Sequence, residues 1–294
     1  MPPASSNPDA LVLSGVWLGL SGVLGLLVGS FLNVVIHRLP LGESVVRPGS
    51  HCPGCQTPIK PWDNVPVLSY LWLRARCRAC GQHISWRYPA VELLVGVLFV
   101  LIAWRFGPGW EAPLWMCFAS VLVAAAMIDI DHQIIPDALS LGGLAAGLVA
   151  VPALRVHQGA SFADALLYSG GGALLGGGLL WAVGFVHARV SVALGRRFDH
   201  WPGEGEELPR PASVDYWTWF PGLGFGDVKL LAMIGAFLGP FGVLATIVMA
   251  SVAGLAIGLG WGLATRSFSS PFGFAPAIAA GALVALLLPA HVCF

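Results

Sequence analysis

The chain has 294 residues, of which 56% are hydrophobic and 10% charged, and its mean hydropathy is +0.78. These values exceed what the core of a soluble domain needs, and they indicate an all-α polytopic membrane protein. The formal net charge is zero and no basic run is long enough to follow a phosphate backbone, which excludes a nucleic-acid-binding protein. Because the first ten residues carry no lysine or arginine, the apolar run after them is expected to be a retained first span, not a cleaved signal.

We expect about eight transmembrane helices, since a span needs roughly 20 apolar residues. The apolar run from 227 to 264 is long enough for two spans, and glycine and proline at Gly239-Pro240 are expected to divide it. The expected spans are residues 11–36, 89–105, 112–130, 138–154, 167–188, 227–240, 241–264 and 272–291. Glycines at four-residue spacing, such as Gly25/Gly29 and Gly172/Gly176, predict close helix packing inside one bundle.

The lysines and arginines favour one orientation of these spans, because basic residues collect in cytoplasmic loops. With both termini outside the cytoplasm, only Arg105 and Arg155 fall in outer loops, and Lys229 lies at the inner mouth of a span. We therefore expect both termini outside the cytoplasm and the 37–88 loop inside it. The remaining basic residues fall in inner loops: Arg38, Arg47, Lys60, Arg74, Arg76, Arg78, Arg87, Arg189, Arg196, Arg197, Arg210 and Arg266.

Three parts follow from this layout. Residues 1–36 form an N-terminal segment with the first span, and residues 37–88 form a small cytoplasmic domain. Residues 89–294 hold the remaining spans and a long cytoplasmic loop at about 189–222.

Two Cys-x-x-Cys pairs in the 37–88 segment predict a metal site. Each pair aims two thiolates at one point, and four thiolates suit a tetrahedral structural zinc ion. Iron is the minor alternative, and a reducing cytoplasm disfavours disulfides. Because the segment has little core of its own, the metal is expected to supply much of its fold. The ligands are Cys52, Cys55, Cys77 and Cys80.

The other candidate ligands have simpler interpretations. Cys117 lies within a span and Cys293 at the extreme C-terminus, and both are interpreted as inert apolar residues. His51 and His83 flank the cysteine pairs, but four cysteines already complete the site.

Acidic residues within apolar segments are costly and are functional candidates by default. Two of them, Asp129 and Asp227, are expected to meet near one membrane face, where paired carboxylates can share a proton and activate a water. Asp227 follows Gly224 and Gly226, whose missing side chains let a backbone or substrate approach. Asp227 begins a helix and Asp129 ends one, so the helix dipoles would bias the first toward the anion and the second toward the acid. This asymmetry is our hypothesis for a base and an acid in one pair.

Four further charged residues are interpreted as supporting. Asp137 follows Pro136 and is expected to cap the next helix, and Asp131 is expected to be solvated. Glu92 could pair with a nearby arginine such as Arg87, and Lys229 is expected to extend toward the membrane surface.

Several motifs then coincide in one order: "GSFLNVVIHRLP" (29–40), the two cysteine pairs around "WDNVPVLSY", "ISWRYPAVEL", "DIDHQIIPD", "GLGFGDVKLL" and "SPFGFAPAIAAGAL". Together they make the chain resemble the type IV prepilin leader peptidase/N-methyltransferase family, a group of bifunctional membrane aspartic proteases. The resemblance covers most of the chain. The Gly-x-Gly-Asp element alone is weak, but its combination with the other motifs is specific.

The resemblance implies an enzyme of the bacterial inner membrane that removes the leader of type IV prepilins or type II secretion pseudopilins. It further implies methylation of the new N-terminal amine with S-adenosylmethionine as donor. The family's catalytic pair maps onto Asp129 and Asp227, and its zinc ligands map onto the four loop cysteines. The chain itself shows no glycine-rich dinucleotide fingerprint, so the residues that bind the donor stay unassigned.

Residues 189–222 are longer than the short loop expected of the family, acidic in "EGEE" and aromatic in "YWTWF". One interpretation is a cytoplasmic loop with aromatics at the bilayer interface, and the other is a gate or substrate contact near Asp227. Two other functions stay open: a peptidase without methyl transfer, and an ion- or proton-coupled transporter, which would leave the cysteine loop unexplained.

Overall fold

The structure is a computed structural model that describes residues 8–196, 210–218, 220, 223–265 and 273–288. Over these residues it is helical, with no strand and only three isolated β-bridges. Six helices are long and apolar enough to cross a membrane, and a shorter apolar helix follows them. The chain divides into two compact units, Met1–Ile128 and Asp129–Phe294.

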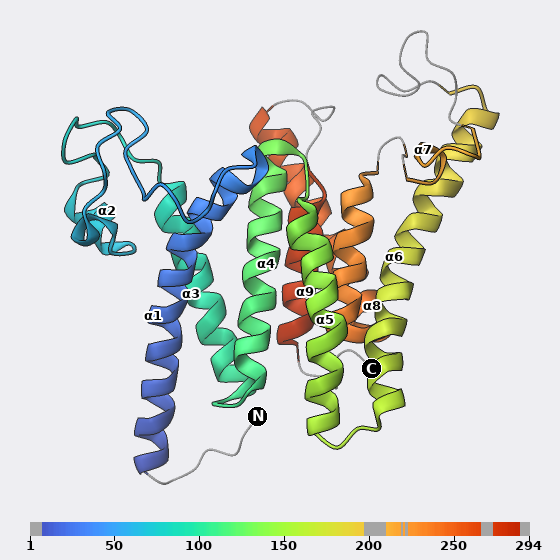
Figure 1. Cartoon of the computed structure of the whole chain (residues 1–294), viewed down its shortest axis with the longest axis horizontal. Coiled ribbons are helices and arrows are strands. Elements are labelled where there is room, and N and C mark those ends of the chain that lie inside the picture. The colour runs from blue at the N-terminus through green and yellow to red at the C-terminus, as the bar shows by residue number, and fades with distance from the viewer. Residues whose placement is uncertain (1–7, 197–209, 219, 221–222, 266–272, 289–294) are drawn as a thin grey trace. The chain divides into compact units, whose positions relative to one another are not determined.

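The first unit is built on two antiparallel helices, α1 (Pro8–Arg38) and α3 (Arg87–Phe106) (Figure 1). The indole of Trp17 donates to the carbonyl of Ala103 near one end, and the amide of Asn33 donates to the carbonyl of Tyr88 near the other. Between them α1 approaches so closely that a Cβ at Gly25 would lie 2.8 Å from the backbone of α3. The glycine spacing therefore serves packing within the bundle, as predicted.

The cysteine loop joins these two helices and contains only short elements. These are two 3₁₀ turns, η1 (Leu39–Leu41) and η2 (Pro61–Asn64), and the helix α2 (Leu68–Trp72). After α3, the helix α4 (Glu111–His132) begins in the first unit and ends in the second.

The second unit consists of α5 (Asp137–His157), α6 (Phe162–Ala193), α7 (Asp215–Thr218), α8 (Phe225–Thr265) and α9 (Ala275–Leu287). The helices α6 and α8 pack with their backbones in contact, because a Cβ at Gly172 would lie 2.1 Å from the carbonyl oxygen of Gly235. The buried hydroxyl of Ser169 donates to the carbonyl of Ala236 beside this crossing.

The helix α8 is broken at Gly239, whose φ of 70° and ψ of −177° are not helical, and Pro240 follows it. The part after the break runs antiparallel to α9, since Gly254 lies beside Ala277 while Gly281 lies beside Thr246. The predicted division of the 227–264 run is therefore confirmed. Counting the two parts of α8 separately, the described residues contain eight apolar helical segments: α1, α3, α4, α5, α6, both parts of α8, and α9.

Candidate functional site

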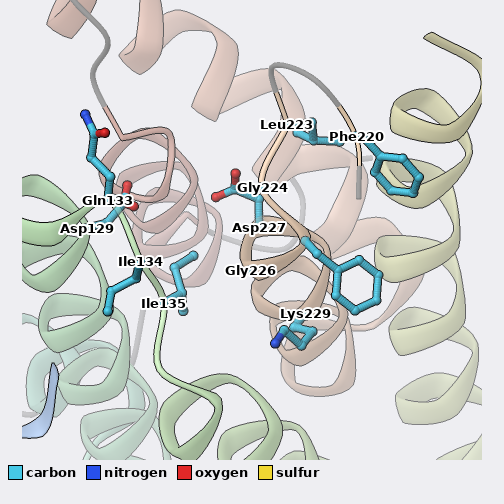
Figure 2. A pocket seen from close by; sticks show the side chains of 11 residues that line it. Asp129, Gln133, Ile134, Ile135, Phe220, Leu223, Gly224, Gly226, Asp227 and Lys229 are labelled. Carbon is cyan, nitrogen blue, oxygen red and sulfur yellow. The ribbon is translucent and has the colours of Figure 1, made fainter. Parts of the chain in front are cut away.

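Two buried carboxylates face each other in an open pocket of about 500 Å³ in the second unit (Figure 2). Asp129 comes from the end of α4 and Asp227 from the first turn of α8, and their exposed fractions are only 5% and 8%. The other residues that line the pocket are Gln133, Ile134, Ile135, Phe220, Leu223, Gly224, Phe225, Gly226 and Lys229. The sequence therefore predicted the residue types and the pair that the fold brings together.

The position of Asp227 follows from how α8 begins. Gly224 precedes the first helical residue, and its backbone N–H hydrogen-bonds the carboxylate of Asp227 three residues later. This is the return contact of a capping box, in which a side chain in the first turn reaches back to the capping residue. A Cβ at Gly224 would lie 3.3 Å from Oδ2 of Asp227, so the glycine leaves room for the carboxylate itself.

The bare backbone at Gly226 has another neighbour. A Cβ there would lie 3.2 Å from Cβ of Ile135, which belongs to the "DIDHQIIPD" segment. The missing side chain at Gly226 therefore lets Ile135 approach closely, which brings the segment after Asp129 against the segment that carries Asp227.

Asp129 is held by a segment to which the sequence assigned no role. The backbone N–H of Ala275, the first residue of α9, donates to Oδ2 of Asp129 over 3.0 Å. A Cβ at Gly273 would lie 1.9 Å from the same oxygen, so a side chain there would displace the carboxylate. The predicted asymmetry from helix ends is incomplete, because the amino-terminal end of α9 also meets Asp129. The available signal was the "SPFGFAP" motif, with Pro276 at a helix start.

Two of the supporting residues form an ion pair that was not predicted. Lys229 Nζ contacts Oδ1 of Asp137. The prediction that Asp137 caps α5 is wrong, because Asp137 is the first helical residue, Pro136 precedes it, and no side-chain cap bond forms. Lys229 also lines the pocket, and its extension toward the membrane surface stays a prediction. Asp131 is exposed, as predicted.

The expected pairing of Glu92 with Arg87 is also wrong. Glu92 is buried in the first unit and its Oε2 accepts a hydrogen bond of 2.7 Å from the backbone N–H of Val67, with Ser30 as a second partner. The guanidinium of Arg87 instead donates to the carbonyl of Met127. Closeness in the sequence favoured Arg87 as the partner of Glu92, whereas the fold places Val67 of the cysteine loop beside Glu92.

The four cysteines of the loop converge as predicted. Their sulfur atoms all lie within 4.8 Å of one another, and those of Cys52 and Cys80 are 3.8 Å apart. Four sulfurs bound tetrahedrally at about 2.3 Å from a zinc ion would be separated by about 3.8 Å, so the cluster has the dimensions of such a site. Among the described residues this is the one cluster that could hold a metal ion, and neither His51 nor His83 belongs to it. Cys293 lies outside the described residues.

Both cysteine pairs lie in turns with the same pattern of backbone hydrogen bonds. Bridges between His51 and Pro58 and between Arg76 and His83 close the two turns. The hydroxyl and then the backbone of Thr57 lower the pKa of the Cys55 thiol to about 6. The thiolate is the form that binds metal ions.

The described aromatic residues of the 189–222 loop, Tyr216, Trp217 and Phe220, pack on α6. Trp217 stacks on Trp181 and Phe185, and the guanidinium of Arg189 lies 3.8 Å from the ring centroid of Tyr216. Phe220 continues this cluster and also lines the carboxylate pocket. The acidic "EGEE" run, at 204–207, lies outside the described residues.

Residues 23–106 match the bacterial peptidase A24 N-terminal domain, and residues 116–259 match the type IV leader peptidase family. This chain belongs to the type IV leader peptidase family. The first match contains the cysteine loop and the second contains both pocket aspartates.

Three relatives illustrate the similarity, each named a prepilin leader peptidase/N-methyltransferase. The Stutzerimonas stutzeri protein is 37% identical over 96% of this chain and 92% of its own length. The Pseudomonas aeruginosa protein is 36% identical over the same shares, and the Neisseria gonorrhoeae protein is 34% identical over 84% and 83%. No solved structure gives a significant match to this chain.

Proposed function

We propose that this chain cleaves the leader from type IV prepilins or type II secretion pseudopilins and then methylates the new N-terminal amine. The single observation that carries the peptidase proposal is the pair of buried carboxylates that face each other across an open pocket. Membership of the type IV leader peptidase family supports it, as do the names of relatives that align over most of the chain.

The proposed reaction uses Asp129 and Asp227 as a general acid–base pair with water as the nucleophile. One carboxylate removes a proton from a water held between them as the water attacks the scissile carbonyl carbon. The other carboxyl group donates its proton to the developing oxyanion. The first carboxyl group then gives the water's proton to the amine nitrogen as the C–N bond breaks, and the new hydroxyl returns a proton to the second carboxylate as the carbonyl re-forms. Because the two groups are coupled, the protons belong to the pair and not to either residue alone.

The surrounding contacts fix this pair before a substrate arrives. The N–H of Ala275 orients one carboxylate and the N–H of Gly224 orients the other. Pre-oriented groups lower the barrier because no reorganisation is needed during the reaction. Lys229, which lines the pocket, and its ion-pair partner Asp137 act as positioning residues.

The proposed metal is zinc, held by the four loop cysteines. With no open position among four thiolates, the ion would be structural and would order the loop. S-adenosylmethionine, as the proposed donor, would supply the methyl group for the N-terminal amine. We assign methyl transfer to the part of the chain that contains this loop, which is the part matched by the N-terminal domain of the family.

The proposed location is the bacterial inner membrane, with the pocket and the cysteine loop on the cytoplasmic side. The excess of lysine and arginine in the loops on that side supports this orientation. The substrate's basic leader would then lie in the cytoplasm and its apolar segment in the lipid.

The test uses membranes that contain the wild type, Asp129→Asn or Asp227→Asn, incubated with a prepilin and a labelled methyl donor. Both variants should lose cleavage, while Asp131→Asn, an exposed neighbour, should retain it. Cleavage by either pocket variant would refute the catalytic pair. If the wild type cleaves the prepilin but transfers no labelled methyl group, the chain is a peptidase without methyltransferase activity. A proton flux without cleavage would favour a transporter.

A further inference from the structure

The short helix α2 (Leu68–Trp72) presents apolar side chains that no described residue covers. The exposed fractions are 65% for Leu68, 64% for Leu71 and 81% for Trp72. Exposure of three large apolar side chains to water on so short a helix is unfavourable. We therefore expect another molecule to cover this surface.

The position of α2 along the membrane-spanning helix α3 indicates what covers these apolar side chains. The helix α3 has 20 residues, which just cross a hydrocarbon core of about 30 Å. Glu92 is five residues beyond the start of α3 at Arg87, which places its backbone about 7.5 Å along the helix axis. The carboxylate of Glu92 accepts from the N–H of Val67, the residue before α2. The start of α2 therefore lies beside the first two turns of a membrane span.

Figure 1 shows the same relation, with α2 on the edge of the loop that reaches down beside the first turns of α3. Apolar and aromatic side chains at this level meet the boundary between lipid headgroups and acyl chains. Arg74 and Arg76 follow α2 directly and are exposed, so they can reach lipid phosphates.

The hydrogen bond between Val67 and Glu92 also fixes the depth of α2 along α3. Glu92 is buried, and a buried carboxylate is costly unless hydrogen bonds satisfy it. Val67 has a φ of 60° and a ψ of −49°, a positive-φ conformation that a β-branched residue rarely adopts. Such strain persists where surrounding contacts hold it. Local backbone hydrogen bonds, such as the one from Leu68 N–H to the carbonyl of Pro66, close the turn around Val67, and the hydrogen bond to Glu92 ties this turn to α3.

We propose that α2 is an interfacial anchor that seats the cysteine loop in the lipid headgroup region, and that Glu92 sets its depth. Leu68, Leu71 and Trp72 face the acyl chains, and the cysteine cluster is thereby held at a fixed height beside the bilayer. The occupant is lipid, not a second copy of the chain or another protein.

Tryptophan quenching in reconstituted full-length protein tests this proposal. The contribution of Trp72 is the fluorescence of the wild type minus that of Trp72→Phe, measured in phosphatidylcholine vesicles with or without dibrominated acyl chains. Bromine close to the headgroup should remove most of this contribution, and aqueous acrylamide should remove little. Quenching by acrylamide alone would place Trp72 in water. Protection from both quenchers would mean that protein covers α2. Either result overturns the proposal.

The role of Glu92 is tested in the same assay with a matched pair of variants. Glu92→Ala removes the acceptor and should lower the quenching of Trp72 by brominated lipid at least about twofold. Glu92→Gln keeps an oxygen that accepts from Val67 and should retain the wild-type quenching. Equal quenching in both variants would show that Glu92 does not set the depth. The readout is independent of cleavage and methyl transfer, so failure of those activities would not affect it.

Discussion

Lys229 and Asp137 form an ion pair although they lie 92 positions apart in the chain. Lys229 follows Asp227 by two residues on α8, and Asp137 begins the helix that follows the Asp129 segment. The pair therefore connects the two segments that carry the facing carboxylates. Because Asp137 is well exposed, the pair contributes at most about 1 kcal/mol to stability, and its effect is expected in catalysis.

We predict that Lys229→Met lowers kcat for leader cleavage about tenfold with little change in KM or in the melting temperature. Small displacements of catalytic groups reduce rates strongly, whereas substrate binding is not directly altered. The exchanged pair, Lys229→Asp with Asp137→Lys, should recover part of the loss seen in each single variant. Full activity in both single variants would show that the ion pair does not position the carboxylates.

Gly273→Ala should abolish most cleavage, with a loss of about 100-fold or more. The added Cβ would lie 1.9 Å from Oδ2 of Asp129, so the carboxylate must move away from the N–H of Ala275. The control is Gly178→Ala in α6, where a Cβ meets nothing within 4 Å. Cleavage assays on purified protein, with melting temperatures to verify folding, compare the two variants. Normal cleavage by Gly273→Ala would contradict the arrangement around Asp129.

The features predictable from sequence are those encoded locally. Glycine and proline marked the break in α8 at Gly239, and the spacing of the cysteines marked their cluster. The contacts of Asp137 and Glu92 could not be predicted. Local rules compare a residue with neighbours one helical turn away, whereas these contacts join residues 92 and 25 positions apart.

The support of Asp129 was missed for a different reason. Its donor is a backbone N–H, which every residue except proline carries, so the identity of Ala275 reveals nothing about the contact. The partners are 146 positions apart and meet only because the second part of α8 turns the chain back before α9 begins.

Removal of metal from the purified protein should disorder the cysteine loop while leader cleavage is affected less. The loop lies in the first unit, whereas both pocket carboxylates lie in the second. We expect about one zinc ion per chain by elemental analysis, and faster proteolysis between residues 50 and 85 after treatment with a chelator. Cys55→Ser should lose the metal, whereas Cys117→Ser, outside the cluster, should retain it. A metal content unchanged in Cys55→Ser would refute the site.

Phe220 is expected to contact the substrate because it lines the pocket. Its ring also packs edge-to-face against Phe185 of α6, which fixes its position. Phe220→Leu keeps an apolar side chain of similar size but removes the aromatic face. We predict a rise in KM of about three- to tenfold with kcat nearly unchanged, because the carboxylates are not displaced. Phe162→Leu, at an exposed aromatic at the start of α6, should leave both constants at their wild-type values. A fall in kcat with constant KM would instead mean that Phe220 orients the turn before Asp227 and does not touch the substrate.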